Sequence, residues 1–467
     1  MVSFSSADLI IIILFFVSVI SVGFITGRKS KNDAEDYLLS GRKVGLFLFI
    51  LTNVATWYGG ILGVGEFVYR YGIVSWFTQG FPYYIFAFLF AIFFAKKIRE
   101  ASLFTIPDKL NLVYGKKVGM ASAVLVFALV SPAPYLLMTG SLISLIFDTN
   151  IFIGLLLGLA LSIIYLFKGG FRSDLYTDVI QFFVMFIGFI LIIIFSYTSL
   201  GGFSYLQSNL PKEHLNLTGN ASPTFIVVWF LIALWTFADP GFHQRCYAAK
   251  SGSVAVKGII ISILFWLLFD ALTTTTGLYA RAFIPNLSNP SLSYPLLAEA
   301  ILPSGIKGIF YAALFATIMS TLNSFLFLSA TTISRDFFFK LSQKPDDKKL
   351  KVFAIYGLLI SGAISVLLAY SIPSVIEIWY TIGSICIPGI IIPVVSSYYT
   401  KLKIDNKLVL LEMIISLLAG LIWFVIRQAF KEVFLLQDLE PMLVGLGLSV
   451  LIHTYGLLRS KFISFVE

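Results

Sequence analysis

A stripe of uncharged side-chain oxygens within a hydrophobic stretch is the first candidate for chemistry. Residues 308–336 are long enough to cross a bilayer, which takes about 20 predominantly apolar residues. At helical spacing, one face of this stretch carries Thr317, Ser320, Thr321 and Ser324, at positions i, i+3, i+4 and i+7. Neutral oxygens at mid-membrane depth can replace the hydration shell of a monovalent cation without adding fixed charge. The stripe therefore indicates an ion site; the alternative is hydroxyls that bond back to their own helix and allow close packing.

Acidic residues inside hydrophobic stretches are the second candidate. Asp270 lies about fourteen residues into the stretch 256–280, with no basic residue within a helical turn. An acid at the bilayer centre costs about 2.5–3.5 kcal/mol, so Asp270 is expected to face a cavity or a partner. Asp178 begins the stretch 174–199. It either takes part in ion binding or release, or only interacts with the dipole at a helix N-terminus.

Other chemistries have no matching pattern in this sequence. The histidines at 214, 243 and 453 are far apart, which indicates no metal site. Cys246 and Cys386 lie in different hydrophobic stretches and indicate no disulfide framework. Nucleophile elbows, phosphate-binding loops and zinc-protease motifs are absent from the sequence. We therefore expect neither an enzyme nor a cofactor other than a coupling ion.

The elements that position these residues are membrane helices. The chain is 58% hydrophobic and 12% charged, whereas about 25% charged residues are usual in soluble domains. Its long apolar runs favour helices over the alternating strands of an outer-membrane barrel. We expect an all-α polytopic membrane protein in which residues 1–467 form a single transmembrane domain. The thirteen expected spans lie near 7–26, 45–69, 73–95, 118–146, 151–167, 174–199, 222–244, 256–280, 305–337, 351–370, 374–399, 408–426 and 440–458.

Lysine and arginine predict the orientation of the chain. With the N-terminus outside, alternate loops contain 27 of the 33 basic residues. Cytoplasmic loops carry an excess of Lys and Arg, so the pattern predicts an outside N-terminus and a cytoplasmic C-terminus in a plasma (inner) membrane. The net charge of +9 follows mostly from this bias and does not indicate binding to nucleic acid.

Two of the expected spans are interrupted. The span 45–69 contains glycines at 59, 60, 63 and 65, and the span 222–244 contains Ala238-Asp239-Pro240-Gly241. The first runs from inside to outside and the second, five spans later, runs in the opposite direction. Broken helices in oppositely oriented halves indicate a binding site near the bilayer midplane.

Four groups of short motifs, in order along the chain, resemble a known family. They are Tyr37-Leu38-Leu39-Ser40-Gly41-Arg42, Thr105-Ile106-Pro107-Asp108 with Tyr114-Gly115, Gly169-Gly170 with Tyr176-Thr177-Asp178-Val179-Ile180-Gln181, and Gln244-Arg245 with Ala248-Ala249-Lys250-Ser251. Here the chain resembles the sodium/solute symporter family, which includes sodium-coupled proline, sugar, sialic acid and choline transporters. The resemblance implies two inverted five-helix repeats, 45–199 and 222–399. One extra N-terminal helix (7–26) and two extra C-terminal helices (408–458) complete the implied fold.

The same resemblance implies a sodium site. Its ligands would be the backbone carbonyls of Leu51, Val54 and Thr317 and the hydroxyls of Ser320 and Thr321. These five neutral oxygens suit a sodium ion at a helix break.

A second sodium site is implied by some members of the family. There, residues matching Asp178, Ser320, Asn323 and Ser324 hold the second ion. Asn323 stands where those relatives have a small hydroxyl residue, so the number of sodium ions stays open.

Aromatic residues indicate the solute. The segment Ala55–Gly60 looks more like the choline-transporting branch of the family than the sugar branch, which would carry an amide where Tyr58 stands. Trp57 and Tyr135 match two positions of that branch's aromatic cage, and such cages hold quaternary ammonium by cation–π attraction. The third cage position falls at Asp239. The expected solute-binding residues are Trp57, Tyr58, Tyr135, Asp239 and Asp270.

The predicted function is sodium-coupled import of a small organic solute by alternating access. The solute is expected to be an amino acid or amine, such as a proline-like zwitterion or a choline-like cation; a sugar or organic acid is the alternative. An ion channel is the alternative of another class, and a membrane enzyme would need a clustered nucleophile and base. The expected partners are the solute, sodium and the lipid bilayer, with no nucleic acid, and the protein is expected to function as a monomer.

Overall fold

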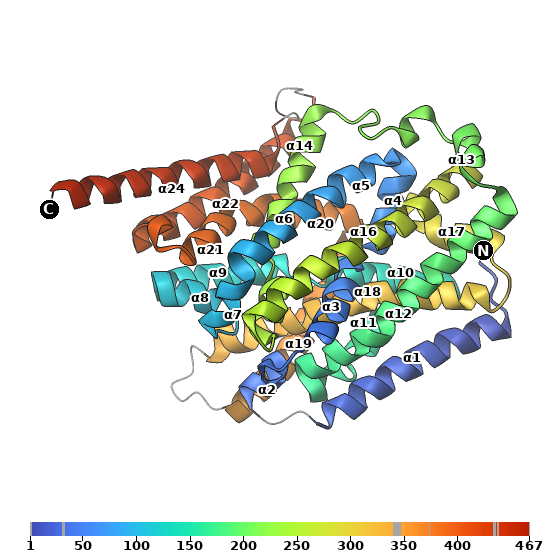
Figure 1. The fold of residues 1–467 in the computed structure, drawn as a ribbon, viewed down its shortest axis with the longest axis horizontal. Coiled ribbons are helices and arrows are strands. Elements are labelled where there is room, and N and C mark those ends of the chain that lie inside the picture. The colour runs from blue at the N-terminus through green and yellow to red at the C-terminus, as the bar shows by residue number, and fades with distance from the viewer. Residues whose placement is uncertain are drawn as a thin grey trace.

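The computed structural model is a bundle of helices (Figure 1). It describes residues 2–29, 33–339, 347–372, 374–432, 436 and 439–466. Within these residues, ten helices are long and apolar enough to cross a membrane, or up to twelve if each of two bent pairs is one span. The same residues form no strand, only an isolated bridge between Val44 and Ala249. The predicted all-α polytopic fold is confirmed. The count of thirteen is not, because the helix Ile151–Ile163 has 13 residues, fewer than the roughly 20 that a span needs.

The first part of the chain alternates long helices with short broken ones. In order these are α1 (Ser6–Gly27), α2 (Ala34–Leu39), η1 (Ser40–Arg42), α3 (Leu46–Ala55), η2 (Thr56–Tyr58), α4 (Ile61–Tyr71), α5 (Val74–Gln79), α6 (Phe81–Phe90), η3 (Ala91–Ala95), α7 (Lys96–Ala101), α8 (Ile106–Tyr114), α9 (Lys116–Leu129), α10 (Ala133–Phe147), α11 (Ile151–Ile163) and α12 (Leu166–Leu200). The predicted span 174–199 is thus only part of α12, which starts at Leu166 and is kinked at Gly170, where φ is 52°. This kink needs glycine, because φ there is positive and a side chain would meet the Tyr37 carbonyl.

The second part of the chain has the same alternation. In order the elements are α13 (Phe203–Asn209), η4 (Lys212–Leu215), α14 (Pro223–Ile232), η5 (Ala233–Phe237), α15 (Pro240–Ala248), α16 (Gly252–Phe283), η6 (Pro290–Leu292), α17 (Ser293–Ile301), α18 (Ile306–Thr331), η7 (Thr332–Phe339), α19 (Asp347–Ser371), α20 (Val375–Cys386), η8 (Ile387–Gly389), α21 (Ile391–Ser397), η9 (Thr400–Leu402), α22 (Asn406–Ala429) and α24 (Pro441–Val466). The last two long helices, α22 and α24, pack together at one side of the bundle (Figure 1).

Both predicted helix breaks occur. The segments Leu46–Tyr58 and Ile61–Tyr71 meet at a bend of 56°. In the second break, Ala238 and Asp239 leave helical geometry between η5 and α15. A third break, a bend of 44° between Val375–Gly389 and Ile391–Ser397, was not predicted from the sequence.

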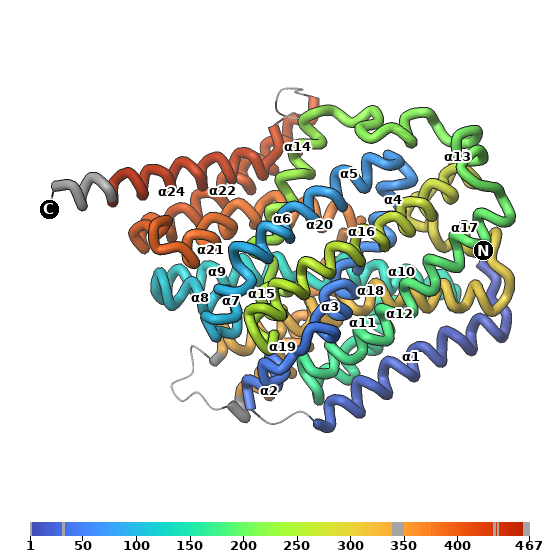
Figure 2. Tube along the Cα trace, viewed as in Figure 1, coloured from blue at the N-terminus to red at the C-terminus, as the bar shows by residue number. Residues whose placement is uncertain are grey.

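Helix α18 is the centre of the bundle, and it packs along α12 (Figure 2). In the most apolar 18-residue stretch of α18, 89% of the residues are buried. In that of α1, at the periphery, the share is 22%. Gly59 in the first break allows α18 to approach closely, because any side chain at Gly59 would overlap Thr321. The predicted stripe of hydroxyls therefore lies directly against the first broken helix.

Candidate functional site

A cavity of about 250 Å³ lies beside the two broken helices. Eleven of its lining residues carry aromatic rings: Trp57, Tyr58, Trp76, Tyr83, Tyr135, Trp229, Trp235, Phe242, Phe325, Trp379 and Tyr380. Its polar residues include Asn53, Thr56, Gln79, Asp239, Arg245, Asp270 and Thr321. All five predicted solute-binding residues therefore line one cavity. A concave site with an apolar wall and a few converging polar groups is typical of small-molecule binding.

Trp57 packs against several neighbouring rings. Its ring stacks on Trp266, with centroids 4.9 Å apart and an interplanar angle of 29°. The edge contact with Tyr83, also at 4.9 Å, brings a second cavity ring beside it. Tyr135 lies against Phe325, with ring centroids 4.9 Å apart. Because these rings pack against one another, they are held in place before any solute binds.

Tyr58 has a structural role in addition to its place in the wall. Its hydroxyl donates to the backbone carbonyl of Trp266 at 2.7 Å, and its ring lies 4.4 Å from that of Phe269. This contact ties the first broken helix to α16 and uses the proton of the Tyr58 hydroxyl.

Asp270 reaches the cavity from α16, as its depth in the membrane predicted. Its carboxylate accepts a hydrogen bond from the Tyr84 hydroxyl, which in turn accepts one from Trp76 Nε1 at 3.2 Å. Gly80 gives the carboxylate room, since a Cβ there would lie 2.7 Å from Oδ2. The described part of the chain places no basic side chain within ion-pair distance of Asp270.

Asp239 acts mainly at the second helix break. Its Oδ1 accepts a hydrogen bond from the backbone N–H of Phe242 at 2.8 Å, so it is the N-cap of α15. Asp239 still lines the cavity, but one of its oxygens is used to start the helix.

Two of the predicted sodium ligands, Ser320 and Thr321, lie on α18 beside Thr56 of the first broken helix. Thr321 Oγ1 donates to the Thr56 carbonyl at 2.6 Å, and Ser320 Oγ donates to Asp178 Oδ1 at 2.8 Å. The hydroxyl of Thr317 bonds back to the carbonyls of its own helix, so only its backbone oxygen fits the predicted role. Leu51 and Val54 are buried in the last turns of α3, directly before the break.

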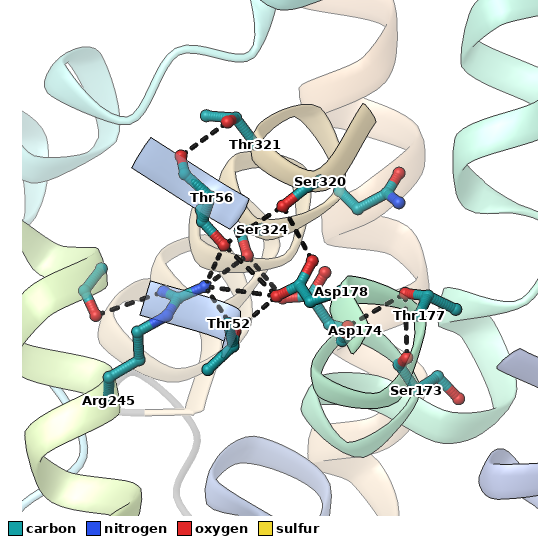
Figure 3. A network of polar contacts seen from close by, with 12 residues as sticks. Thr52, Thr56, Ser173, Asp174, Thr177, Asp178, Arg245, Ser320, Thr321 and Ser324 are labelled. Atoms are coloured by element: carbon teal, nitrogen blue, oxygen red, sulfur yellow. Dashed lines mark hydrogen bonds and ion pairs between the residues drawn. The ribbon is translucent and has the colours of Figure 1, made fainter. Parts of the chain in front are cut away.

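Asp178 does not act as a helix cap. It lies within α12 and is fully buried, and its carboxylate accepts hydrogen bonds from Thr52, Thr56 and Ser320. The interpretation of Asp178 as a partner of the helix N-terminus alone is therefore wrong, because α12 begins before it. Its carboxylate joins the first broken helix to α18 (Figure 3).

The second group of predicted ion ligands is divided. Ser324 lies in the polar cluster, where its hydroxyl donates to Asp174 Oδ2 at 2.5 Å. The side-chain amide of Asn323 instead contacts the Tyr165 hydroxyl. The structure therefore brings Asp178 and Ser324 together and turns Asn323 to another partner.

Two buried charges in this cluster were not predicted from the sequence. Arg245 follows the predicted span 222–244, but it belongs to α15 and is 3% exposed. Asp174 lies one turn before Asp178 on α12 and is fully buried. The sequence did offer a signal, because Arg245 and Asp174 both lie next to hydrophobic spans. Ionisable residues at membrane depth face a cavity or a partner, so both could have been predicted to be buried in such a cluster.

Taken together, a polytopic helical bundle with broken helices, a cavity beside them and buried oxygens next to it defines a secondary transporter. The model of the sodium:solute symporter family matches residues 37–429. The chain belongs to this family, as its motifs predicted.

Named relatives transport different solutes. The chain is 27% identical over 399 residues to high-affinity choline transporter 1 of Drosophila melanogaster, a match that covers 80% of this chain and 64% of that protein. It is 25% identical over 442 residues to the osmoregulated proline transporter of Bacillus subtilis, covering 88% and 87%. It is 28% identical over 401 residues to the sodium/pantothenate symporter of Haemophilus influenzae, covering 79% and 80%.

One solved structure shares the fold over nearly the whole chain. It is a Na⁺-coupled sialic acid symporter in a substrate-bound, outward-open state, with a TM-score of 0.83 and 98% of each chain covered. At 16% sequence identity, this likeness shows the fold alone.

Proposed function

We propose that this protein is a sodium-coupled symporter that imports a small organic cation, with a choline-like quaternary ammonium as the first candidate. The observation that carries the proposal is Asp270, a carboxylate in an aromatic cavity with no basic partner among the described residues. An ammonium group supplies the missing positive charge. The similarity to choline transporters is consistent with this chemistry.

The aromatic wall suits the same solute. An ammonium group over the face of Trp or Tyr gains about 0.5–2 kcal/mol, more when water is excluded. Trp57 and Tyr83 lie edge to face at one side of the cavity, and Tyr135 lies near Trp379 at another, with centroids 6.1 Å apart. These rings would surround the methyl groups while Asp270 balances the charge.

A proline-like zwitterion is the second candidate. The side-chain amides of Asn53 and Gln79 both line the cavity, and neither amide nitrogen has a hydrogen-bond partner among the described residues. Amide N–H groups of this kind can bind a carboxylate. A zwitterion would then place its nitrogen toward Asp270 and its carboxylate toward these amides.

The coupling ion would bind beside the cavity. The proposed ligands are the carbonyls of Leu51, Val54 and Thr317 and the hydroxyls of Ser320 and Thr321. Thr321 lines the solute cavity as well, so ion and solute would share a wall. Sodium that holds α18 against the first broken helix would thereby stabilise the form that binds solute.

The remaining features of the proposal concern the setting. The lysine and arginine distribution supports a plasma (inner) membrane location with the N-terminus outside and the C-terminus cytoplasmic. We further propose that a single chain, organised as repeats 45–199 and 222–399, is the functional unit, because both proposed sites lie within one chain.

The test is a solute panel in proteoliposomes. Purified protein is reconstituted, and uptake of labelled choline, proline, pantothenate and glucose is measured with and without an inward sodium gradient. We expect choline to accumulate inside the proteoliposomes only when the inward sodium gradient is present, and proline to be the next best substrate. Accumulation of glucose but not of choline or proline would overturn the solute assignment, and fast ohmic flux without accumulation would indicate a channel.

A further inference from the structure

Arg245 lies at the centre of the buried polar cluster (Figure 3). Its Nη2 is 2.5 Å from Thr56 Oγ1 and 3.1 Å from the hydroxyls of both Thr52 and Ser324. The same nitrogen is 3.8 Å from Oδ2 of Asp178. A guanidinium NH₂ group has two hydrogens, so it can donate to only two of the four oxygens that surround it. Such a ring of hydroxyls and one carboxylate is the environment that a bound monovalent cation would have.

The charges around Arg245 do not balance by themselves when both neighbouring carboxylates, Asp174 and Asp178, are ionised. Asp174 and Asp178 lie one turn apart on α12, and both are fully buried. Asp174 uses Oδ2 to accept from Ser324 at 2.5 Å, whereas its Oδ1 has no hydrogen-bond partner among the described residues. The charged groups that act on Asp174 are Asp178 and Arg245. Two ionised carboxylates with one guanidinium leave one negative charge, and a buried charge requires a partner.

We propose that Arg245 is a built-in cation that takes the place of a second sodium ion, so that this protein binds one sodium ion per transport cycle. The inference rests on the proposed sodium-coupled function and adds the number of ions to it. One sodium at Ser320 and Thr321, adjacent to Asp178, makes the cluster neutral together with Arg245. The side-chain amide of Asn323 contacts the Tyr165 hydroxyl, which agrees with a second ion position that is already filled.

Direct sodium binding tests this number without knowledge of the solute. Purified protein is titrated with radioactive sodium at constant ionic strength, and bound sodium per protein is counted at saturation. We expect one ion for the wild type. Arg245→Gln leaves two carboxylates without the guanidinium, and we expect two ions for this variant. Arg281→Gln, a control on the outer part of α16, should bind one ion, because Arg281 contacts Tyr69 and Pro285 instead of the cluster.

A double variant protects the test against simple misfolding. Asp174→Asn combined with Arg245→Gln removes one charge of each sign, so it should bind one ion and be produced at wild-type abundance. If Arg245→Gln alone does not fold, a count of one in both the wild type and the double variant supports the proposal.

The outcomes separate the two proposals. Two ions bound to the wild type, or one ion of unchanged affinity bound to Arg245→Gln, would overturn the inference and leave sodium symport intact. Absence of saturable sodium binding in the wild type would instead overturn the proposed function.

Discussion

Replacing Asp270 by Asn tests the solute assignment most sharply, because the change removes one charge and keeps the shape. The carboxylate lies in the cavity wall on α16, where its hydrogen-bond donor is the Tyr84 hydroxyl. An amide at this position can still accept that hydrogen bond through its oxygen. The variant therefore isolates the attraction between the carboxylate and a positively charged solute.

The expected size of the effect follows from electrostatics. Two unit charges about 5 Å apart attract by about 3 kcal/mol at an effective dielectric constant of about 20. The Tyr84 hydroxyl already offsets part of the carboxylate charge, and the amide keeps a dipole, so about half of this energy should be lost. A loss of about 1.5–2 kcal/mol raises the half-saturating concentration of an ammonium solute roughly 10- to 30-fold.

The assay is uptake of labelled choline into proteoliposomes over a range of choline concentrations at saturating sodium. Half-saturating sodium should change little, because the proposed ion ligands lie on α3 and α18 and Asp270 lies on α16. Glu100→Gln is a matched control, since its partner is the exposed Lys96 and the two are 3.8 Å apart. Choline uptake by Asp270→Asn with less than a twofold change in half-saturating concentration and in maximal rate would refute the cation-binding argument and favour an uncharged solute.

Three further predictions concern the proposed ion site and the segment around His214. Ser320→Ala or Thr321→Ala should raise half-saturating sodium at least tenfold, a loss of about 1.4 kcal/mol. Thr317→Val removes a hydroxyl that is bonded only to its own helix, so it should leave the half-saturating sodium concentration unchanged. Equal effects in all three variants would indicate that these hydroxyls serve helix packing and do not bind sodium. Asp178→Asn should slow sodium-driven turnover at normal abundance, whereas normal turnover with low abundance would indicate a purely structural role. Burial lowers the pKa of His214 below its usual 6.5, although a hydrogen bond with the Tyr69 carbonyl acts to raise it. As the pH falls, His214 therefore takes up a proton in the unfolded chain before it does so in the folded chain. Thermal stability should thus fall as the pH drops below about 6.5, and His214 should not affect it at higher pH. A His214→Asn variant whose melting temperature changes as much as that of the wild type between about pH 7.5 and 5.5 would contradict this.

Much of the fold was predictable because a membrane imposes its rules locally. Long apolar runs must form helices in lipid, since every backbone group needs an internal hydrogen bond. The glycines at 59 and 60 and the Ala238–Gly241 segment indicated the two breaks for the same reason. The third break, after Gly389, had weaker local evidence, a single Pro-Gly pair within a continuous apolar run.

The candidate site was predictable in part. The hydroxyl stripe on α18 follows from helical spacing alone, and Asp270 follows from the cost of an acid at membrane depth. The family motifs indicated which carbonyls on α3 would meet the stripe. Each of these inferences depends on neighbours within one helix, or on a pattern shared with other proteins.

The sequence by itself determined the class of protein, its helices and the polar faces that they present. Only the tertiary structure decided which of these faces meet. It placed Arg245 of α15 among hydroxyls of α3 and α18, turned Asn323 toward Tyr165, and stacked Trp57 on Trp266. The physical reason is that periodicity within a helix is a local property, whereas these contacts join residues up to about 200 positions apart. Charge balance in the buried cluster depends on those contacts, and so does the proposed number of sodium ions.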